Sequence, residues 1–246
     1  MHQGTAGFGR GDGGFVHIGE VAVAEVAAQW FGRRRPDEAV PECLAWLPEP
    51  VRRTYSTTSP VLWEAGGIWQ VDVPRPARSD PGKRVFMSED EGEWVWAYDA
   101  NDTDRFFDLG PDESDWKAVD AGLAELLAQR SLLEIAHGPV SHRAISQIPP
   151  ALLPDVVTGL TEVTACPWRS MPGLRLHLGD GVLVVSSFGR EDVAPFHHVD
   201  DALAVHVAVT RPEKADYLAD REWPRPWDVR PSRSPEWIRA YAERAR

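Results

Sequence analysis

The stretch VFMSEDEGEWVWAYD, residues 85–99, gives the clearest indication of the fold. It predicts a β-hairpin whose strands, 84–87 and 93–98, flank an acidic turn. In the second strand Trp94, Trp96 and Tyr98 alternate with Val95 and Ala97, so both faces of that strand are apolar. A strand that is apolar on both faces is typical of the centre of a sheet. We therefore expect this strand to be central and its tryptophans to belong to the core.

Outward from this hairpin, helical and extended patterns alternate along the chain. Helices are predicted over 21–31, ending at Gly32; over 47–55; over 121–137, from a cap at Asp120 to a stop at Gly138; over 151–160, as a broken helix; over 211–220; and from about 235 to the end. Strands are predicted over 66–73, 104–109 and 202–210, with a hairpin over 174–188 that turns at Gly179-Asp180-Gly181. The glycine-rich residues 1–14 are expected to be disordered. Residues 15–246 are expected to form a single α+β domain, a mostly antiparallel sheet flanked by helices.

Acidic charge is concentrated in one segment of the chain. The net charge of the 246 residues is −12, and between Ser88 and Asp115 eleven acidic residues accompany Arg105 alone. Such a field repels nucleic acid and attracts basic proteins. Acidic loops also serve simply to keep a protein soluble, and that interpretation stays open at this point.

Composition and motifs argue against several functional classes. No run approaches the ~20 apolar residues of a membrane span, and the N-terminus lacks the pattern of a signal peptide, so we expect a cytoplasmic protein without membrane contact.

Cys43 and Cys166 have neither disulfide nor metal-ligand spacing. The GRGDGG run at 9–14 has no preceding strand to make it a phosphate-binding loop. His197 and His198 are adjacent, so on a strand they point to opposite faces and do not share one metal ion. Nucleophile motifs are absent, and we expect neither catalysis nor a cofactor or metal.

Three segments resemble, in their order, pieces of the SUKH superfamily, which includes cell-wall-synthesis regulators and bacterial immunity proteins. LPEPVRRTY (47–55) resembles the family's Leu-Pro-x-x-x-Arg-x-aromatic helix. VFMSEDEGEWVWAYD resembles its central hairpin, with Glu89, Asp90, Glu91 and Gly92 in the places of a Glu-Asn-Gln-Gly-like turn. DLGPDESDWKAVDAGLAELLAQRSLLEIA (108–136) resembles its tryptophan followed by a leucine-rich helix. The resemblance covers about residues 41–137 and implies an α+β fold with a mostly antiparallel sheet. It also implies a protein that binds and neutralises a toxin, often a nuclease, without doing chemistry.

Charge and resemblance together lead to one expectation, a non-enzymatic, immunity-type protein that binds a basic toxin domain and no nucleic acid. The residues expected to contact the partner are Glu89, Asp90, Glu91, Glu93, Asp102 and Asp104. Two alternatives remain. One is an intracellular regulatory scaffold of the same fold, and the other is a metal-dependent hydrolase whose carboxylates and histidines converge from distant segments.

Overall fold

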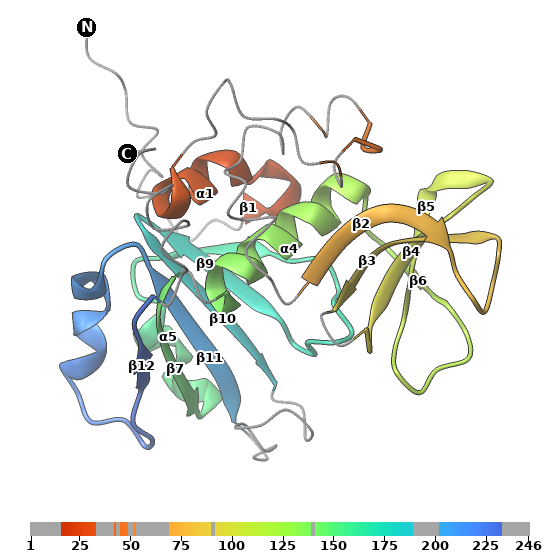
Figure 1. Ribbon diagram of the computed structural model, residues 1–246. Coiled ribbons are helices and arrows are strands. Elements are labelled where there is room, and N and C mark those ends of the chain that lie inside the picture. The colour runs from red at the N-terminus through yellow and green to blue at the C-terminus, as the bar shows by residue number, and fades with distance from the viewer. Residues whose placement is uncertain are drawn as a thin grey trace, which may run out of the picture.

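The computed structural model describes residues 16–32, 42, 45–48, 52, 69–89, 92–138, 141–188 and 202–232. Their strands form two sheets, one of seven strands and one of five, and the helix α4 (Leu123–His137) follows the last strand of the five-stranded sheet in the chain (Figure 1). Helices and largely antiparallel sheets together confirm the predicted α+β class.

The five-stranded sheet is a meander in chain order. It consists of β2 (Trp69–Pro76), β3 (Lys83–Glu89), β4 (Val95–Asp99), β5 (Asp102–Leu109) and β6 (Lys117–Val119), all antiparallel. The strand β4 is central, as the alternation predicts, and its two faces are buried by different neighbours. Trp96 packs into the main core, whereas Ala97 joins a small cluster with Ala77 and Val85 on the other face.

The seven-stranded sheet is antiparallel except at one edge. Its order is β1 (Val16–His17), β8 (Thr161–Thr164), β9 (Arg175–Gly179), β10 (Val182–Phe188), β11 (Leu203–Val209), β7 (His142–Ile148) and β12 (Asp228–Arg230), and only β1 and β8 are parallel. The predicted hairpin over 174–188 is confirmed as β9 and β10. Gly181 in its turn has φ 64°, a conformation that favours glycine.

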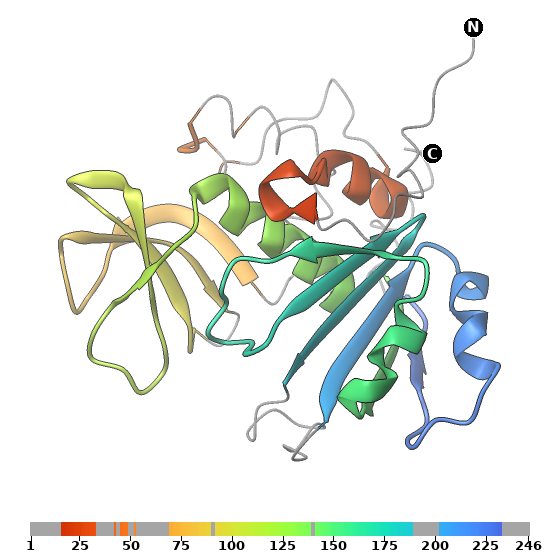
Figure 2. The same cartoon turned by 180° about the vertical axis from the view of Figure 1, so that it is seen from behind.

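Helices cover both faces of the seven-stranded sheet (Figures 1 and 2). The helices α1 (Val23–Phe31) and α4 pack on one face, against Leu183 and Val185. The opposite face, which includes Val184, is covered by the 3₁₀-helix η3 (Pro150–Leu152), α5 (Leu153–Val156) and the 3₁₀-helix η4 (Pro212–Ala219). A short 3₁₀-helix, η1 (Ile18–Glu20), precedes α1.

The predicted helices 21–31 and 121–137 are confirmed as α1 and α4, and the segment 151–160 is broken, as predicted, into η3 and α5. The helix α4 begins at Leu123 rather than after Asp120, because Gly122 is the N-cap and its N–H donates to the Glu125 carboxylate at 2.7 Å. The segment predicted as a helix over 211–220 is a 3₁₀-helix. Most of the predicted helix 47–55, and the one expected from about 235, lie outside the described residues.

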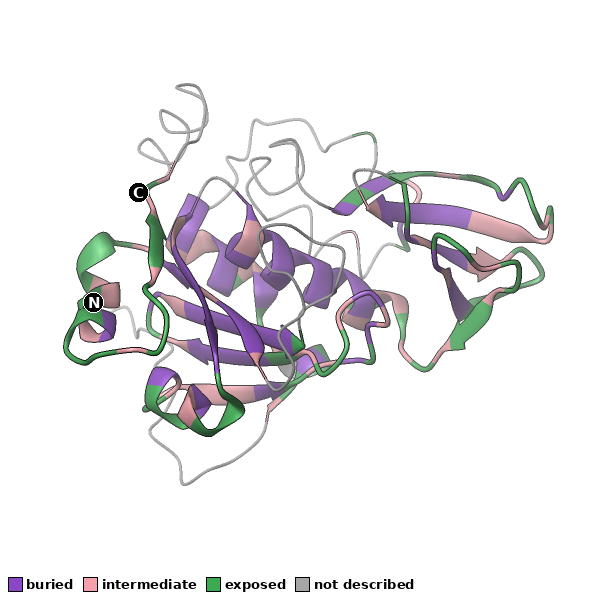
Figure 3. Cartoon of the chain, turned by 90° about the horizontal axis from the view of Figure 1, so that it is seen from below, coloured by how far each residue is buried: buried purple, intermediate pink, exposed green. Residues whose placement is uncertain are grey.

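A single hydrophobic cluster joins the two sheets through α4. It contains Phe86 and Trp96 from the five-stranded sheet, and Leu176 and Leu183 from the seven-stranded sheet. The helix itself is buried on all sides from Leu126 to Ala136, polar residues included. In Figure 3 the buried residues fill this central region, whereas exposed residues lie in the turns of the five-stranded sheet and also along η4 and β12. Among the described residues, no helix is both long enough and apolar enough to cross a membrane.

Candidate partner-binding surface

The four predicted contact residues that the structure describes fall at two opposite ends of the five-stranded sheet. Glu89 ends β3, and the exposed Glu93 lies just before β4. Asp102 and Asp104, both exposed, lie at the start of β5. Asp90 and Glu91 are outside the described residues.

The strand pairing separates these two groups. Val95, the first residue of β4, pairs with Ser88, whereas Asp99, its last residue, pairs with Asp102. The five residues of β4 therefore stand between the groups, a length of about 17 Å. The structure brings Glu89 near Glu93, and Asp102 near Asp104, but it does not bring the two pairs together.

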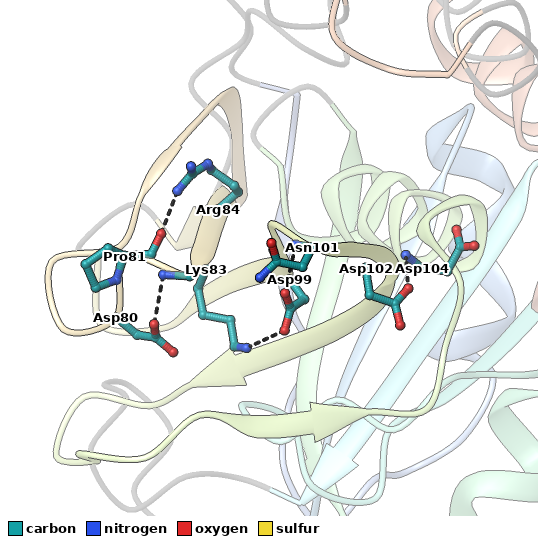
Figure 4. Close-up of polar contacts among 9 residues, drawn as sticks. Asp80, Pro81, Lys83, Arg84, Asp99, Asn101, Asp102 and Asp104 are labelled. Carbon is teal, nitrogen blue, oxygen red and sulfur yellow. Dashed lines mark hydrogen bonds and ion pairs between the residues drawn. The ribbon is translucent and has the colours of Figure 1, made fainter.

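At the Asp102 end, acidic groups are matched by basic ones. Lys83 Nζ lies 3.1 Å from Asp99 Oδ2 (Figure 4) and 3.9 Å from the centre of the Phe107 ring. The N–H of Asn101 also donates to Asp99, at 2.9 Å. These two donors, Asn101 first and Lys83 second, hold the pKa of Asp99 below its ordinary value.

Other cations lie at this same end. Arg84 in β3 donates to the carbonyl oxygen of Pro81 at 2.7 Å (Figure 4), and Arg105 follows Asp104 directly in β5. The Asp102 side chain is engaged locally, accepting from the N–H of Asp104 at 3.4 Å. This end of the sheet therefore presents mixed charge rather than an acidic field.

The opposite end collects acidic residues from two segments. Because Val95 pairs with Leu109, the loop after β5 lies beside the turn before β4. This loop contributes the exposed Asp112 and Asp115 and the half-buried Glu113. We call the following set the acidic end: Glu89, Glu93, Asp112, Glu113 and Asp115. Prediction from the sequence missed the three loop residues, since only the register of β4 with β5 places them beside Glu93.

Arg169 ties a second segment of the chain to the acidic end. Its Nη1 lies 2.7 Å from Asp108 Oδ1, its Nη2 bonds to Glu113, and its guanidinium stands 5.1 Å from the Trp94 ring centre. Asp108 is only 1% exposed. Burial raises its pKa to about 6, although the nearby Arg169 acts in the opposite direction. Arg169 thus fastens the loop 165–174, between β8 and β9, to the five-stranded sheet.

Glu113 and Gly110 complete this junction. Glu113 accepts the Gly110 N–H at 3.0 Å, and this bond, followed by the contact with Arg169, lowers the pKa of the Glu113 carboxyl. A Cβ on Gly110 would stand 3.0 Å from Trp94 Cη2, a tighter contact than most side chains make. Glycine at this position therefore lets the indole approach the loop closely.

A surface groove runs along the loop 165–174, next to the acidic end. It has a volume of about 610 Å³. Its lining is mostly apolar and consists of Trp94, Ala165, Cys166, Pro167, Trp168, Arg169, Met171, Pro172, Gly173 and Leu174. Cys166, in its wall, is fixed by Gln129 of α4, which accepts the Cys166 N–H at 2.8 Å and donates to its carbonyl at 3.1 Å.

Burial shifts the pKa values of several titratable groups near the groove and in the core. Burial raises the pKa of the Cys166 thiol to about 12, so the reactive thiolate is disfavoured. Burial also lowers the pKa of His137 and of His177 to about 4, leaving both neutral. Among the described residues, no group of three or more His, Cys, Asp or Glu side chains is placed to hold a metal ion. His197 and His198 lie outside this part of the chain.

Comparison of this chain with protein-family models, with curated proteins and with solved structures found no match.

Proposed function

We propose that this chain is a non-enzymatic, immunity-type protein that binds and neutralises a basic toxin domain in the cytoplasm. The observation that carries the proposal is the acidic end, where Glu93, Asp112 and Asp115 from two different segments are all exposed. Their carboxylates form one field because the pairing of β4 with β5 holds the two segments side by side.

The electrostatic argument favours a nuclease as the toxin. An enzyme that binds nucleic acid presents lysines and arginines to the phosphates. A protein with clustered carboxylates is steered to that same surface and, once bound, excludes the substrate. The resemblance of residues 41–137 to the SUKH superfamily supports the same conclusion from a separate premise, since its members commonly bind toxins without doing chemistry.

Affinity capture with matched charge variants tests this proposal. The wild-type chain, immobilised and exposed to native lysate at low and then at raised salt, should retain a basic protein that salt releases. The double substitution Glu93→Lys with Asp112→Lys should abolish retention at low salt. The control is Asp102→Lys with Asp104→Lys, which changes the net charge equally at the other end of the same sheet and should retain the partner.

The captured protein is then identified by mass and assayed for its own activity. Inhibition of a nuclease or another toxin by the wild-type chain, and not by the Glu93→Lys, Asp112→Lys variant, supports neutralisation. Equal retention by both double variants would contradict a role for the acidic end. A housekeeping partner whose activity is unaffected would favour the regulatory scaffold instead.

A further inference from the structure

The groove along the loop 165–174 exposes apolar surface directly beside the carboxylates of the acidic end. Pro167, Pro172 and Gly173 are exposed, and Met171 and Leu174 are half-buried. The apolar surface continues past the groove onto Phe188, which is 48% exposed. The Phe188 ring lies against Gly173, since a Cβ built on that glycine would be 2.4 Å from Phe188 Cδ2.

The walls of the groove are held by hydrogen bonds at several positions. Gln129 binds both backbone groups of Cys166, and Arg169 is held by Asp108 and Glu113. The Phe188 N–H donates to the carbonyl of Pro172 at 2.9 Å. The Met171 N–H donates to the carbonyl of Trp168, also at 2.9 Å. A groove built this way exists before a ligand arrives, so binding does not bear the cost of ordering the loop.

We infer that this groove receives an apolar side chain of the basic partner, from a segment in which Lys or Arg residues flank a Phe, Leu or Met. This inference rests on the proposed function and specifies the partner segment that it requires. Protein interfaces are commonly centred on an apolar anchor in a preformed pocket, with charged residues at the rim. Here Trp94, Trp168 and Met171 supply the apolar lining.

The charged groups beside the groove indicate which residues should flank the apolar side chain of the partner. Arg169, the cation in the groove wall, is already bound by two carboxylates, so it offers little to an acidic ligand. Beyond it, Asp112 and Asp115 are exposed and favour cations. An anionic lipid surface or a nucleic acid would be repelled by the same carboxylates.

Two synthetic peptides serve as the probe, one of sequence Gly-Arg-Lys-Phe-Lys-Arg-Gly and one with Ala in place of Phe, both labelled and blocked at their ends. Fluorescence anisotropy at low ionic strength should show the Phe peptide binding about tenfold more tightly than the Ala peptide, the gain expected from burying one large apolar side chain. In NMR spectra of the full chain, only the Phe peptide should shift the indole N–H signals of Trp94 and Trp168.

Substitutions in the groove should remove this tenfold preference. Met171→Lys places a cation within the lining, and Pro172→Lys does so at an exposed position that does not enter the core. The matched control is Val229→Lys, at an apolar residue of β12 that is 70% exposed and outside the groove. It should leave the preference unchanged.

The outcomes separate this inference from the proposed function. Equal affinity for the two peptides, unaffected by Met171→Lys and Pro172→Lys, would overturn the groove as an anchor site. In that case weaker binding of both peptides to the Glu93→Lys, Asp112→Lys variant would still support the acidic end. If that variant bound both peptides as tightly as the wild type, while the preference for Phe persisted, the groove would stand and the electrostatic proposal would fail.

Discussion

Arg130 and Glu134, one turn apart on α4, bind the two backbone groups of the same residue, Trp69. The Arg130 guanidinium donates to the Trp69 carbonyl from Nε at 2.9 Å and from Nη2 at 2.7 Å. The Trp69 N–H donates to Glu134 Oε1 at 2.6 Å. The two side chains also form an ion pair of 3.7 Å, and both are almost fully buried. Together they provide for the first residue of β2 the hydrogen bonds that a neighbouring strand would otherwise supply.

Replacing Arg130 should strongly destabilise the protein. Arg130→Met leaves the Glu134 carboxylate buried without its cation and the Trp69 carbonyl without its donors. Breaking a buried pair on one side costs about 3–5 kcal/mol of the free energy of unfolding. Urea unfolding monitored by circular dichroism measures this loss. A loss below about 1 kcal/mol would show that water reaches the pair and replaces the lost contacts.

Replacing Gln129 should loosen the groove locally. Gln129→Leu leaves the Cys166 N–H and carbonyl buried without partners, at about 1–3 kcal/mol for each unsatisfied group. Hydrogen exchange of the Cys166 amide should therefore be at least about tenfold faster. The Val185 amide, central in β10, is the internal control for global unfolding. Unchanged protection of Cys166 relative to Val185 would contradict the role given to Gln129.

Asp108 should make the wild-type protein less stable as the pH rises. Burial raises the pKa of Asp108 from 3.8 to about 6. Between these two pH values the folded state therefore keeps a proton that the unfolded state has released. The stabilisation from this proton is complete below pH 3.8 and is lost as the pH rises to about 6. We expect Asp108→Asn, which is always neutral, to be more stable than the wild type by up to about 3 kcal/mol at neutral pH.

Unfolding of the two proteins in urea at pH 4.5, 5.5 and 7.5 tests this expectation, since these values lie within and above the window of the Asp108 shift. The advantage of the variant should grow across the window and stay constant above it. A less stable Asn variant at neutral pH would mean that the ion pair with Arg169 outweighs the cost of burying the carboxylate.

His137 should act in the opposite direction and limit stability in acid. Burial lowers its pKa from 6.5 to about 4, so below pH 6.5 the unfolded chain takes up a proton that the folded chain does not. Stability due to this group is complete above pH 6.5 and falls by about 1.4 kcal/mol per pH unit towards pH 4. We expect His137→Phe to reduce the slope of unfolding free energy against pH by this amount.

The phenylalanine keeps an aromatic ring next to His206, whose ring centre lies 4.1 Å from that of His137. Chemical unfolding at a series of pH values between 4.5 and 7.5 gives the slope for each protein. An identical slope in the wild type and the variant would show that His137 gains its proton equally in both states.

The sequence predicts the elements with strong local signals. The alternation of Trp96 with Ala97 predicts a central strand, and β4 lies at the centre of its sheet. Gly181 predicts the turn between β9 and β10, because its positive φ is one that few residues adopt. In both cases the residues that carry the signal lie within a few positions of the structure that they determine.

The elements that the sequence does not predict depend on distant partners. β7 contains Arg143, Ser146 and Gln147, whose polarity hides the strand pattern. In the structure Ser146 and Gln147 are buried against Arg225 and Pro226, about eighty residues further along the chain. On α4, Gln129, Arg130 and Glu134 resemble a solvated face in the sequence, although all three are buried and bind distant backbone groups.

The candidate site shows the same dependence. The run of acidic residues from 88 to 115 is evident in the sequence, but its division into two ends follows only from the pairing of β4 with β3 and β5. Arg169 and the groove come from a segment more than fifty residues away from Glu113 and Asp108. No local pattern indicates that they meet.

The contacts of Gln129 and those of Arg130 and Glu134 point in different directions around the axis of α4. Gln129 and Arg130 are consecutive, so they point about 100° apart around the helix axis. Glu134 follows Arg130 by one turn and points the same way. Gln129 reaches the chain just after β8, on the side of the seven-stranded sheet, whereas Arg130 and Glu134 reach the first residue of β2 in the other sheet. Slippage of the helix by one position would turn all three side chains away from their partners at once. The periodicity of this helix, together with the Arg169 junction, therefore sets the orientation of one sheet against the other.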